Sequence, residues 1–262
     1  DGKKDVIVQS DKKPNIGIYW FEIPENPTQR WNKHTISAVK HHGGISPGGV
    51  GDLDGDGDND IVDVNCWLEN DGNGGGWISH AIDFGKKGVS ELTDRGRVYS
   101  YGYSARSIVT DIDEDGDNDI IAVDCDQVDS TAAVLYNDGD GNFIKVALPQ
   151  NSPRYGSLHS LGVADFNNDG LLDVATVEQQ DMTWHIFVSP RWIIWEQSED
   201  NTWTEHIVVN NGLAGHDCSY GDVDDDGDID MVAKVWNAYS DADSSTWGSY
   251  TPEYVSYIEN IG

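Results

Sequence analysis

Carboxylate and amide side chains recur at fixed spacing in four short segments of the sequence. Each segment has the form D-x-[DN]-x-D-G-x-x-D, and the four copies occupy residues 52–60, 111–119, 165–173 and 222–230. Oxygen ligands at alternate positions, with glycine at the sixth for a sharp turn, suit Ca²⁺. The seventh position supplies a backbone carbonyl, so its side chain is free to vary. The segments therefore predict four calcium sites, with positions one, three, five, seven and nine at Asp52, Asp54, Asp56, Asp58 and Asp60; Asp111, Asp113, Asp115, Asp117 and Asp119; Asp165, Asn167, Asp169, Leu171 and Asp173; and Asp222, Asp224, Asp226, Asp228 and Asp230.

An EF-hand begins with a similar loop, but it also needs a bidentate glutamate at position twelve and a helix on each side. Three of the four copies lack a carboxylate at position twelve, and β-forming residues such as IVDV and IIAV follow each loop. The sequence therefore argues against EF-hands. The N-terminal stretch DGKKDVIV aligns with the second half of a loop, which makes Asp1 and Asp5 candidate ligands of a partial fifth site.

The loops recur every 54 to 59 residues, the period of a repeat architecture. After each loop and its β-run comes an aromatic-rich segment such as CWLEN or IIWEQ, then a turn, then a segment such as WISHAI or WTEHIV. A short Gly/Ser-rich segment leads into the next loop. This order predicts an all-β fold, a β-propeller of four-stranded antiparallel blades with a calcium loop between the first and second strand of each.

The loop motif and the β-run after it resemble the FG-GAP and VCBS repeats of calcium-binding propellers, which occur in integrin-like heads, propeller lectins and polysaccharide-degrading enzymes. The resemblance extends over essentially the whole chain. It implies a propeller fold, but not one activity, because propellers have many functions.

About five repeat units are expected within one domain, approximately 1–40, 41–100, 101–154, 155–211 and 212–262. The first unit lacks its innermost strand and the last lacks its outermost strand, so both terminal blades are incomplete. The favoured interpretation is that the chain is part of a longer protein. The alternative is that other copies of the chain complete the open edges.

The formal net charge of −31 comes largely from the loops, which contain 20 of the 47 acidic residues. Such a chain does not suit nucleic acid as a partner, and no apolar stretch is long enough for membrane insertion. Calcium loops suit an extracellular or cell-surface location, where calcium is abundant. The pairing of Cys66, Cys125 and Cys218 stays open, because three cysteines cannot all pair within one chain.

The histidines divide into two groups. His34, His80 and His206 share the pattern W-x-x-H-x-[IV], so a structural role is expected. His159 and His216 instead begin innermost strands, and antiparallel geometry places them on the face away from calcium. Other residues expected on this calcium-distal face, from innermost strands and second-strand ends, are Tyr101, Tyr103, Arg106, Trp67, Asp124, Asp126, Glu178, Lys234 and Trp236.

Aromatic rings, carboxylates and bases together suit sugars. The sequence thus predicts a glycan-binding or adhesion module, with Trp67, Tyr103, Arg106, His159, His216 and Trp236 as ligand-binding residues. The alternative is a polysaccharide lyase in which His159 or His216 abstracts a proton and Arg106 or Lys234 neutralises the sugar carboxylate. A third hypothesis is a structural subunit of a surface fibre, suggested by the open blade edges.

Overall fold

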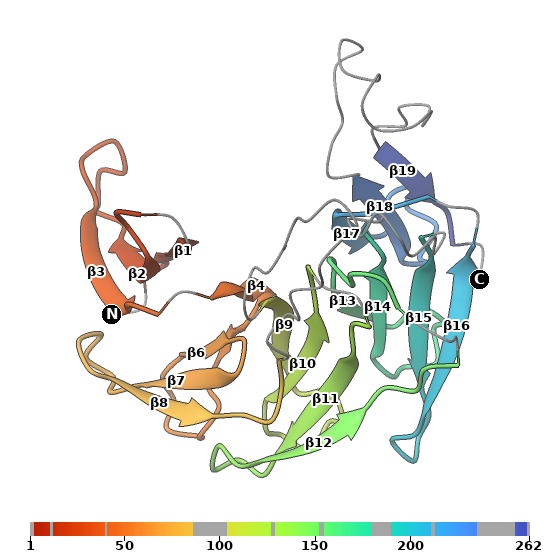
Figure 1. Ribbon diagram of the computed structural model, residues 1–262, viewed down its shortest axis with the longest axis horizontal. Helices are drawn as coiled ribbons and strands as arrows, with labels where there is room; N and C mark the ends of the chain where they lie inside the picture. The colour runs from red at the N-terminus through yellow and green to blue at the C-terminus, as the bar shows by residue number, and fades with distance from the viewer. Residues whose placement is uncertain are drawn as a thin grey trace, which may run out of the picture.

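In the part of the chain that the structure describes, the strands form five sheets that follow one another along an arc (Figure 1). A computed structural model describes residues 3–10, 13–39, 41–85, 104–126, 129–151, 155–179, 190–210, 213–234 and 255–260. No helix occurs in these residues, and hence none that could cross a membrane. The strands are β1 (Val6–Ser10), β2 (Gly17–Glu22), β3 (Asn32–Ser37), β4 (His42–Gly48), β5 (Val50–Gly51), β6 (Asp60–Asp63), β7 (Cys66–Asn70), β8 (Trp77–Ala81), β9 (Ser104–Thr110), β10 (Asp119–Asp124), β11 (Ala132–Asn137), β12 (Phe143–Ala147), β13 (Gly162–Ala164), β14 (Asp173–Val177), β15 (Trp192–Gln197), β16 (Trp203–Val209), β17 (Asp217–Gly221), β18 (Asp230–Lys234) and β19 (Val255–Ile258).

Each sheet is a meander whose neighbours in sequence pair antiparallel. The orders are β1-β2-β3, β5-β6-β7-β8, β9-β10-β11-β12, β13-β14-β15-β16 and β17-β18-β19, with β4 added to the third sheet. The first and last sheets have three strands each, as the incomplete terminal units predict. An all-β, propeller-like arrangement is thus confirmed, whereas a closed ring of blades is not seen: among the described residues no strand of the first sheet pairs with one of the last.

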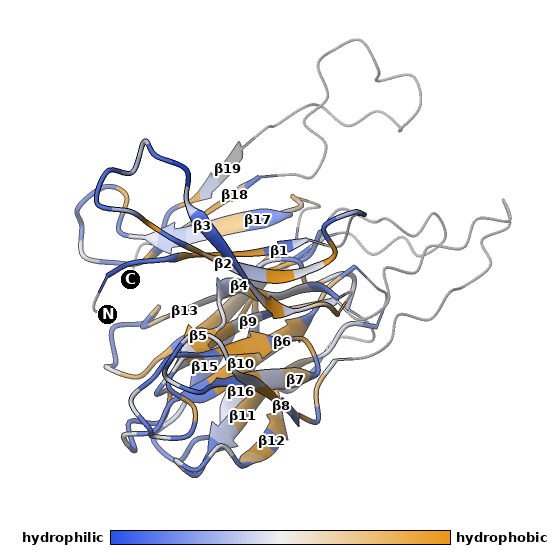
Figure 2. Ribbon diagram, turned by 90° about the vertical axis from the view of Figure 1, so that its left-hand side faces the viewer, coloured by the Kyte–Doolittle hydropathy of each residue, from blue (hydrophilic) through white to orange (hydrophobic). Residues whose placement is uncertain are grey.

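The core lies between successive sheets, as the packing of propeller blades requires. One cluster joins β10 and β11 to β14 and β15, and it includes Val123, Val134, Val174 and Trp195. Similar clusters lie between the other neighbouring sheets. The middle strands β10 and β14 are buried along their whole length because they have a sheet on either side. Figure 2 shows the corresponding hydrophobic colour on β6 and β10 and hydrophilic colour on the surrounding loops.

The innermost segment of the second unit differs from the prediction of four antiparallel strands per blade. Only Val50–Gly51 pairs with β6, while β4 crosses to the next sheet and pairs parallel with β9, His42 opposite Ser104. Two glycines permit this approach, since a Cβ on Gly43 would lie 2.2 Å from the Ala105 carbonyl oxygen and one on Gly44 would lie 2.7 Å from the Val64 nitrogen. Both have positive φ angles of 80° and 101°, which glycine adopts without strain.

Candidate functional site

The four acidic loops all lie where the sequence predicts them, between the innermost strand of a sheet and its second strand. The aspartate at position one shapes each loop by accepting backbone N–H groups from the turn. Asp111, for example, accepts from Asp115 at 3.1 Å and from Gly116 at 3.0 Å. Asp52, Asp165 and Asp222 make equivalent bonds to their own loops. The motif therefore fixes its own backbone.

The aspartate at position nine ties each loop to its sheet. Asp119 is buried, and its two oxygens accept the N–H of Ile112 at 3.1 Å and the N–H of Asn137 at 2.8 Å. Asp60, Asp173 and Asp230 have the same pair of backbone donors. Burial raises the pKa of Asp60, Asp119 and Asp173 to about 6. The two backbone hydrogen bonds lower the pKa of each carboxyl only in part, and the charges of nearby aspartates raise it further.

The aspartate at position three faces its acidic neighbours. Asp113 Oδ1 is buried without a hydrogen-bond partner, and burial together with Asp115 and Asp111 raises the pKa of its carboxyl. Burial and neighbouring carboxylates likewise raise the pKa of Asp54 and Asp224. Carboxylate oxygens gather within 4.8 Å of one another in three loops, at Asp52, Asp54 and Asp60, at Asp111, Asp113 and Asp115, and at Asp222, Asp224 and Asp230. An orphaned buried oxygen among like charges is what a bound cation would satisfy.

In the first two loops the side chain at position seven lies toward the following hairpin. Asp58 and Asp117 lie against Gly72 and Gly139 of the following hairpins, where an added Cβ would lie 2.3 Å and 2.7 Å from a carboxylate oxygen. This placement fits a backbone carbonyl ligand at position seven, where the third loop has Leu171. In that loop the Asn167 amide donates to Asp169 Oδ2 at 3.0 Å.

Asp5 occupies the position-nine place of the first sheet. Its Oδ1 accepts the N–H of Ile23 at 3.3 Å, as Asp119 accepts that of Asn137, although Asp5 is exposed. Asp1, the other residue predicted for a partial fifth site, lies outside the described residues.

The face opposite the acidic loops, which the sequence predicts as the calcium-distal face, gathers polar side chains from three successive sheets. The rings of His159 and His216 stack with centroids 3.6 Å apart. Arg106 on β9 places Nη2 at 3.0 Å from His159 Nδ1 and donates through Nη1 to Ser46 Oγ at 3.0 Å. The sequence predicts these three residues on one face, from the antiparallel order of the strands. In the fold they also touch: Arg106 and His159 are 53 positions apart in sequence, and His159 and His216 are 57 apart.

Asp217 and Lys234 extend this cluster to solvent. Asp217 Oδ2 lies 3.0 Å from His216 Nδ1 and accepts from Lys234 Nζ at 3.1 Å, while Asp217 Oδ1 lies 3.9 Å from Arg106 Nη2. The side chains of Asp217 and Lys234 are 55% and 51% exposed, whereas that of His159 is 2% exposed. Burial, with the charges of His159 and Arg106, lowers the pKa of His216 to about 4, so its ring is neutral at pH 7.

His42 belongs to the same face and was missed by the sequence reasoning. The parallel pairing of β4 with β9 brings it to Asp126, with His42 Nε2 3.3 Å from Asp126 Oδ2. The sequence placed Asp126 on this face but gave it no partner. The Gly43–Gly44 pair after His42 was the available signal, since paired glycines favour close backbone approach. Burial by itself raises the pKa of the Asp126 carboxyl. Hydrogen bonding and charge from His159, the charge of His42 and a hydrogen bond from Ser104 lower it by more, and the pKa falls to about 2.

Trp67 lies apart from this cluster. The sequence placed it at the end of a second strand, whereas it lies on the third strand, β7, paired with Val62 and His80. Its side chain is 3% exposed in a core cluster, because the hairpin around Gly141 of the next sheet packs over its ring. Tyr103 and Trp236, also predicted to bind ligand, lie outside the described residues, as does Tyr101.

The histidines of the repeat pattern have structural partners, as predicted. His34 stacks on Trp20 and His80 on Trp67, with ring centroids 3.9 Å and 4.4 Å apart. His80 and His206 lie 2.5 Å and 2.6 Å from the carboxylates of Glu69 and Glu196. Among the cysteines, Cys66, Cys125 and Cys218 are all free thiols.

The fold and its acidic loops define a propeller-like, all-β repeat protein, and comparison with known families agrees. An FG-GAP-like repeat is found at residues 111–176, from the second acidic loop through the third. No curated protein is significantly similar in sequence to the chain.

Among solved structures, the chain is similar to a lectin of Agrocybe aegerita described for specific recognition of non-reducing terminal N-acetylglucosamine. The two are 17% identical with a TM-score of 0.44, and the alignment covers 82% of this chain and 54% of the lectin chain. The chain thus spans about half the length of that protein.

Proposed function

We propose that this chain is a calcium-stabilised, extracellular propeller-like domain that binds glycans on its calcium-distal face. The observation that carries the proposal is the contact of Arg106, Asp217 and Lys234 on this face, where they arrive from two different sheets. Each departs from the pattern of the repeat, whereas the loops and core follow it. Departures from a repeat mark the places where a scaffold carries function.

The chemistry of these groups suits sugar hydroxyls. A hydroxyl both donates and accepts, so it needs an acceptor and a donor side by side. Asp217 supplies the acceptor, and Arg106 and Lys234 supply donors within 3.9 Å and 3.1 Å of it. A charge-assisted hydrogen bond is also stronger than one between neutral groups, which helps a ligand compete with water.

In the proposed domain Ca²⁺ has a structural role. The oxygens of Asp111, Asp113, Asp115 and Asp119 would hold it in the second loop, with the Asp117 carbonyl. Bound calcium neutralises charges that otherwise repel, and it joins the innermost strand to the second strand of each sheet. The calcium loops would therefore hold the sheets that present the distal face.

A polysaccharide lyase is the second candidate, because His159 and His216 stack beside the Arg106 guanidinium. The burial of both rings and the pKa of about 4 for His216 weaken this candidate. A general base works best when its pKa is near the working pH, so glycan binding without turnover is the better supported proposal.

The test is a glycan array in calcium with the wild type, Arg106→Ala and Lys234→Ala. His206→Ala serves as the control, because His206, like Lys234, is exposed and paired with a carboxylate but lies on the outer strand β16. We expect both distal-face variants to lose binding at least about tenfold, the equivalent of one charge-assisted hydrogen bond, with unchanged melting temperatures. Equal binding by all four proteins would refute the site. Formation of unsaturated oligosaccharides from acidic polysaccharides would instead establish the lyase.

A further inference from the structure

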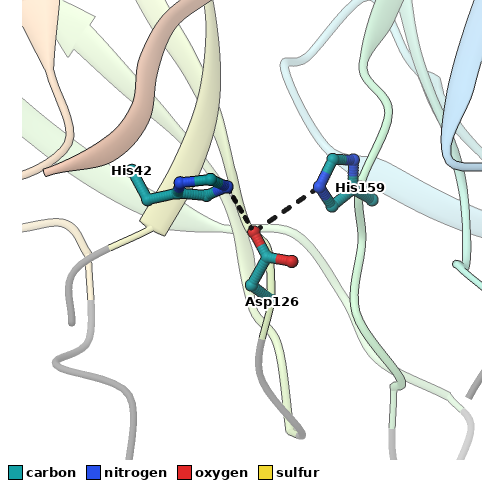
Figure 3. A group of neighbouring side chains, drawn as sticks. All are labelled: His42, Asp126 and His159. Atoms are coloured by element: carbon teal, nitrogen blue, oxygen red, sulfur yellow. Dashed lines mark ion pairs between the residues drawn. The ribbon is translucent and has the colours of Figure 1, made fainter. Parts of the chain in front are cut away.

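His42, Asp126 and His159 form a compact group in which both imidazoles point at one carboxylate oxygen (Figure 3). His42 Nε2 lies 3.3 Å from Asp126 Oδ2, and His159 Nε2 lies 3.5 Å from the same atom. The three ligand atoms all lie within 4.8 Å of one another. We propose that these residues bind a divalent transition-metal ion, Zn²⁺ above all, at a site separate from the acidic loops.

The distances favour a shared ion over direct hydrogen bonds. Good N–H···O bonds are about 2.7–3.2 Å long, so both contacts are long for that role. Ligand atoms placed about 2.0–2.1 Å from a tetrahedral Zn²⁺ are about 3.4 Å apart. The two contacts of 3.3 Å and 3.5 Å therefore match two edges of such a tetrahedron.

Neighbouring groups hold the ligands in orientations suited to a metal. His159 Nδ1 lies 2.9 Å from the carbonyl oxygen of His216, to which it donates when Nε2 carries the lone pair for the ion. Arg106 Nη2 is also 3.0 Å from Nδ1, a contact that suits the opposite tautomer. With a metal on His159 Nε2, the partner left for Arg106 Nη2 would be Asp217 Oδ1, which is 3.9 Å away. Such outer partners commonly orient metal-bound histidines.

Asp126 is fixed from two sides. Ser104 Oγ donates to Asp126 Oδ2 at 3.0 Å, and the Asp126 N–H donates to Ser157 Oγ at 2.8 Å. Asp126 itself has φ of 56°, so the backbone takes a left-handed turn immediately after β10 that places the carboxylate here. A carboxylate with an outer-shell donor in this position is an ordinary feature of metal centres.

A second group, His159, His216 and Asp217, also lies within 4.8 Å, but it suits a metal less well. The two rings stack with an interplanar angle of 29°. Ring nitrogens direct their lone pairs in the ring plane, so nearly parallel stacked rings do not converge on one ion. Asp217 Oδ2 is moreover occupied by Lys234 Nζ at 3.1 Å.

The donor set selects the metal. Two imidazoles and one carboxylate suit Zn²⁺ and its neighbours in the first transition row, while Ca²⁺ prefers oxygen ligands throughout. Three protein ligands leave a coordination position for water or a ligand oxygen. His42 is 36% exposed, which gives this position a route to solvent, whereas His159 and Asp126 are buried.

The test uses untagged protein with Ca²⁺ in large excess, so that the acidic loops are filled, and Co²⁺ as a spectroscopic substitute for Zn²⁺. We expect one equivalent of Co²⁺ to produce the visible absorption of a four- or five-coordinate ion with nitrogen ligands, and Zn²⁺ to abolish it by displacement. Wild-type protein that shows only the weak spectrum of hydrated Co²⁺ would overturn the proposal.

Variants locate the ion. His42→Ala is the main one, because His42 is partly exposed, and it should weaken Zn²⁺ binding at least about 100-fold with a melting temperature close to that of the wild type. Asp126→Asn should act in the same direction. His206→Ala removes another exposed, carboxylate-paired histidine and should bind as the wild type does. If Asp217→Asn abolishes binding while His42→Ala does not, the ion lies in the second group and this assignment is wrong. These titrations contain no glycan, so their result is independent of the function proposed above.

Discussion

Asp119 allows the structural role of an acidic loop to be separated from the calcium binding that we propose for it. The side chain is buried, and it accepts one N–H from Ile112 and one from Asn137. Asp119→Ala leaves both donors buried without a partner. Each such group costs about 1–3 kcal/mol, so the free energy of unfolding should fall by about 2–6 kcal/mol even without metal.

Calcium adds a second contribution. A site filled at 100 times its Kd stabilises the folded state by about 2.7 kcal/mol, and Asp119→Ala should lose this as well. The assay is urea unfolding of wild type and variant, once in excess Ca²⁺ and once in excess EDTA. The difference between the proteins in EDTA reports the hydrogen bonds, and its increase in Ca²⁺ reports the metal.

Asp117→Leu is the matched control. It places at position seven of the second loop the residue that Leu171 provides in the third, and it keeps the backbone carbonyl. We expect a change within about 0.5 kcal/mol in calcium, typical of a surface substitution. If Asp119→Ala is as stable as the wild type in EDTA, the two backbone bonds do not support the fold and the reasoning is refuted. If the loss is the same in Ca²⁺ and EDTA, Asp119 is not a calcium ligand.

Two further predictions concern calcium. EDTA should lower the melting temperature substantially and Mg²⁺ should restore it poorly, because Mg²⁺ tolerates irregular oxygen cages badly. An unchanged melting curve in EDTA would contradict the calcium assignment. Calorimetric titration should show the Asn167 loop as the weakest complete site. In calcium-free protein, the free energy of unfolding should decrease as pH rises from about 4 to about 6. The pKa of Asp60, Asp119 and Asp173 lies near 6 in the folded state, above the ordinary 3.8. The folded state therefore holds these protons more tightly than the unfolded state, and the stability they contribute is lost as they dissociate. Excess Ca²⁺ should remove this decrease, since it binds the ionised carboxylates, and urea unfolding across this pH range measures both curves.

The acidic loops and, apart from β4, the strands and their order could be predicted from the sequence because the interactions that define them are local. The position-one aspartate of each loop accepts N–H groups from residues three to five positions later, so a nine-residue segment contains most of the information for its shape. The repeat of this segment fixed the order of strands, and antiparallel pairing then placed Arg106, His159 and His216 on one face. These steps need no knowledge of how the sheets pack.

The contacts between sheets could not be predicted in this way. Trp67 was expected at a binding face, yet the hairpin around Gly141 covers it in the core. The sequence predicted no partner for Asn137 outside its own sheet, yet its amide donates at 2.9 Å to the carbonyl of Leu53, 84 residues earlier, in the loop of the preceding sheet. Burial and hydrogen bonds of this kind depend on which sheet surfaces come into contact. The repeat pattern of the sequence does not show which surfaces these are.

His42 shows this limit most clearly. The repeat places His42 near the start of the second unit and predicts no contact for it. In the folded chain the small residues Gly43 and Gly44 let β4 pair in parallel with β9, which carries His42 to Asp126 and His159. The sequence determined the loops and strands through local hydrogen bonds and periodic hydrophobicity. The tertiary structure alone decided which side chains of different sheets share a site, because that depends on packing between segments far apart in the chain.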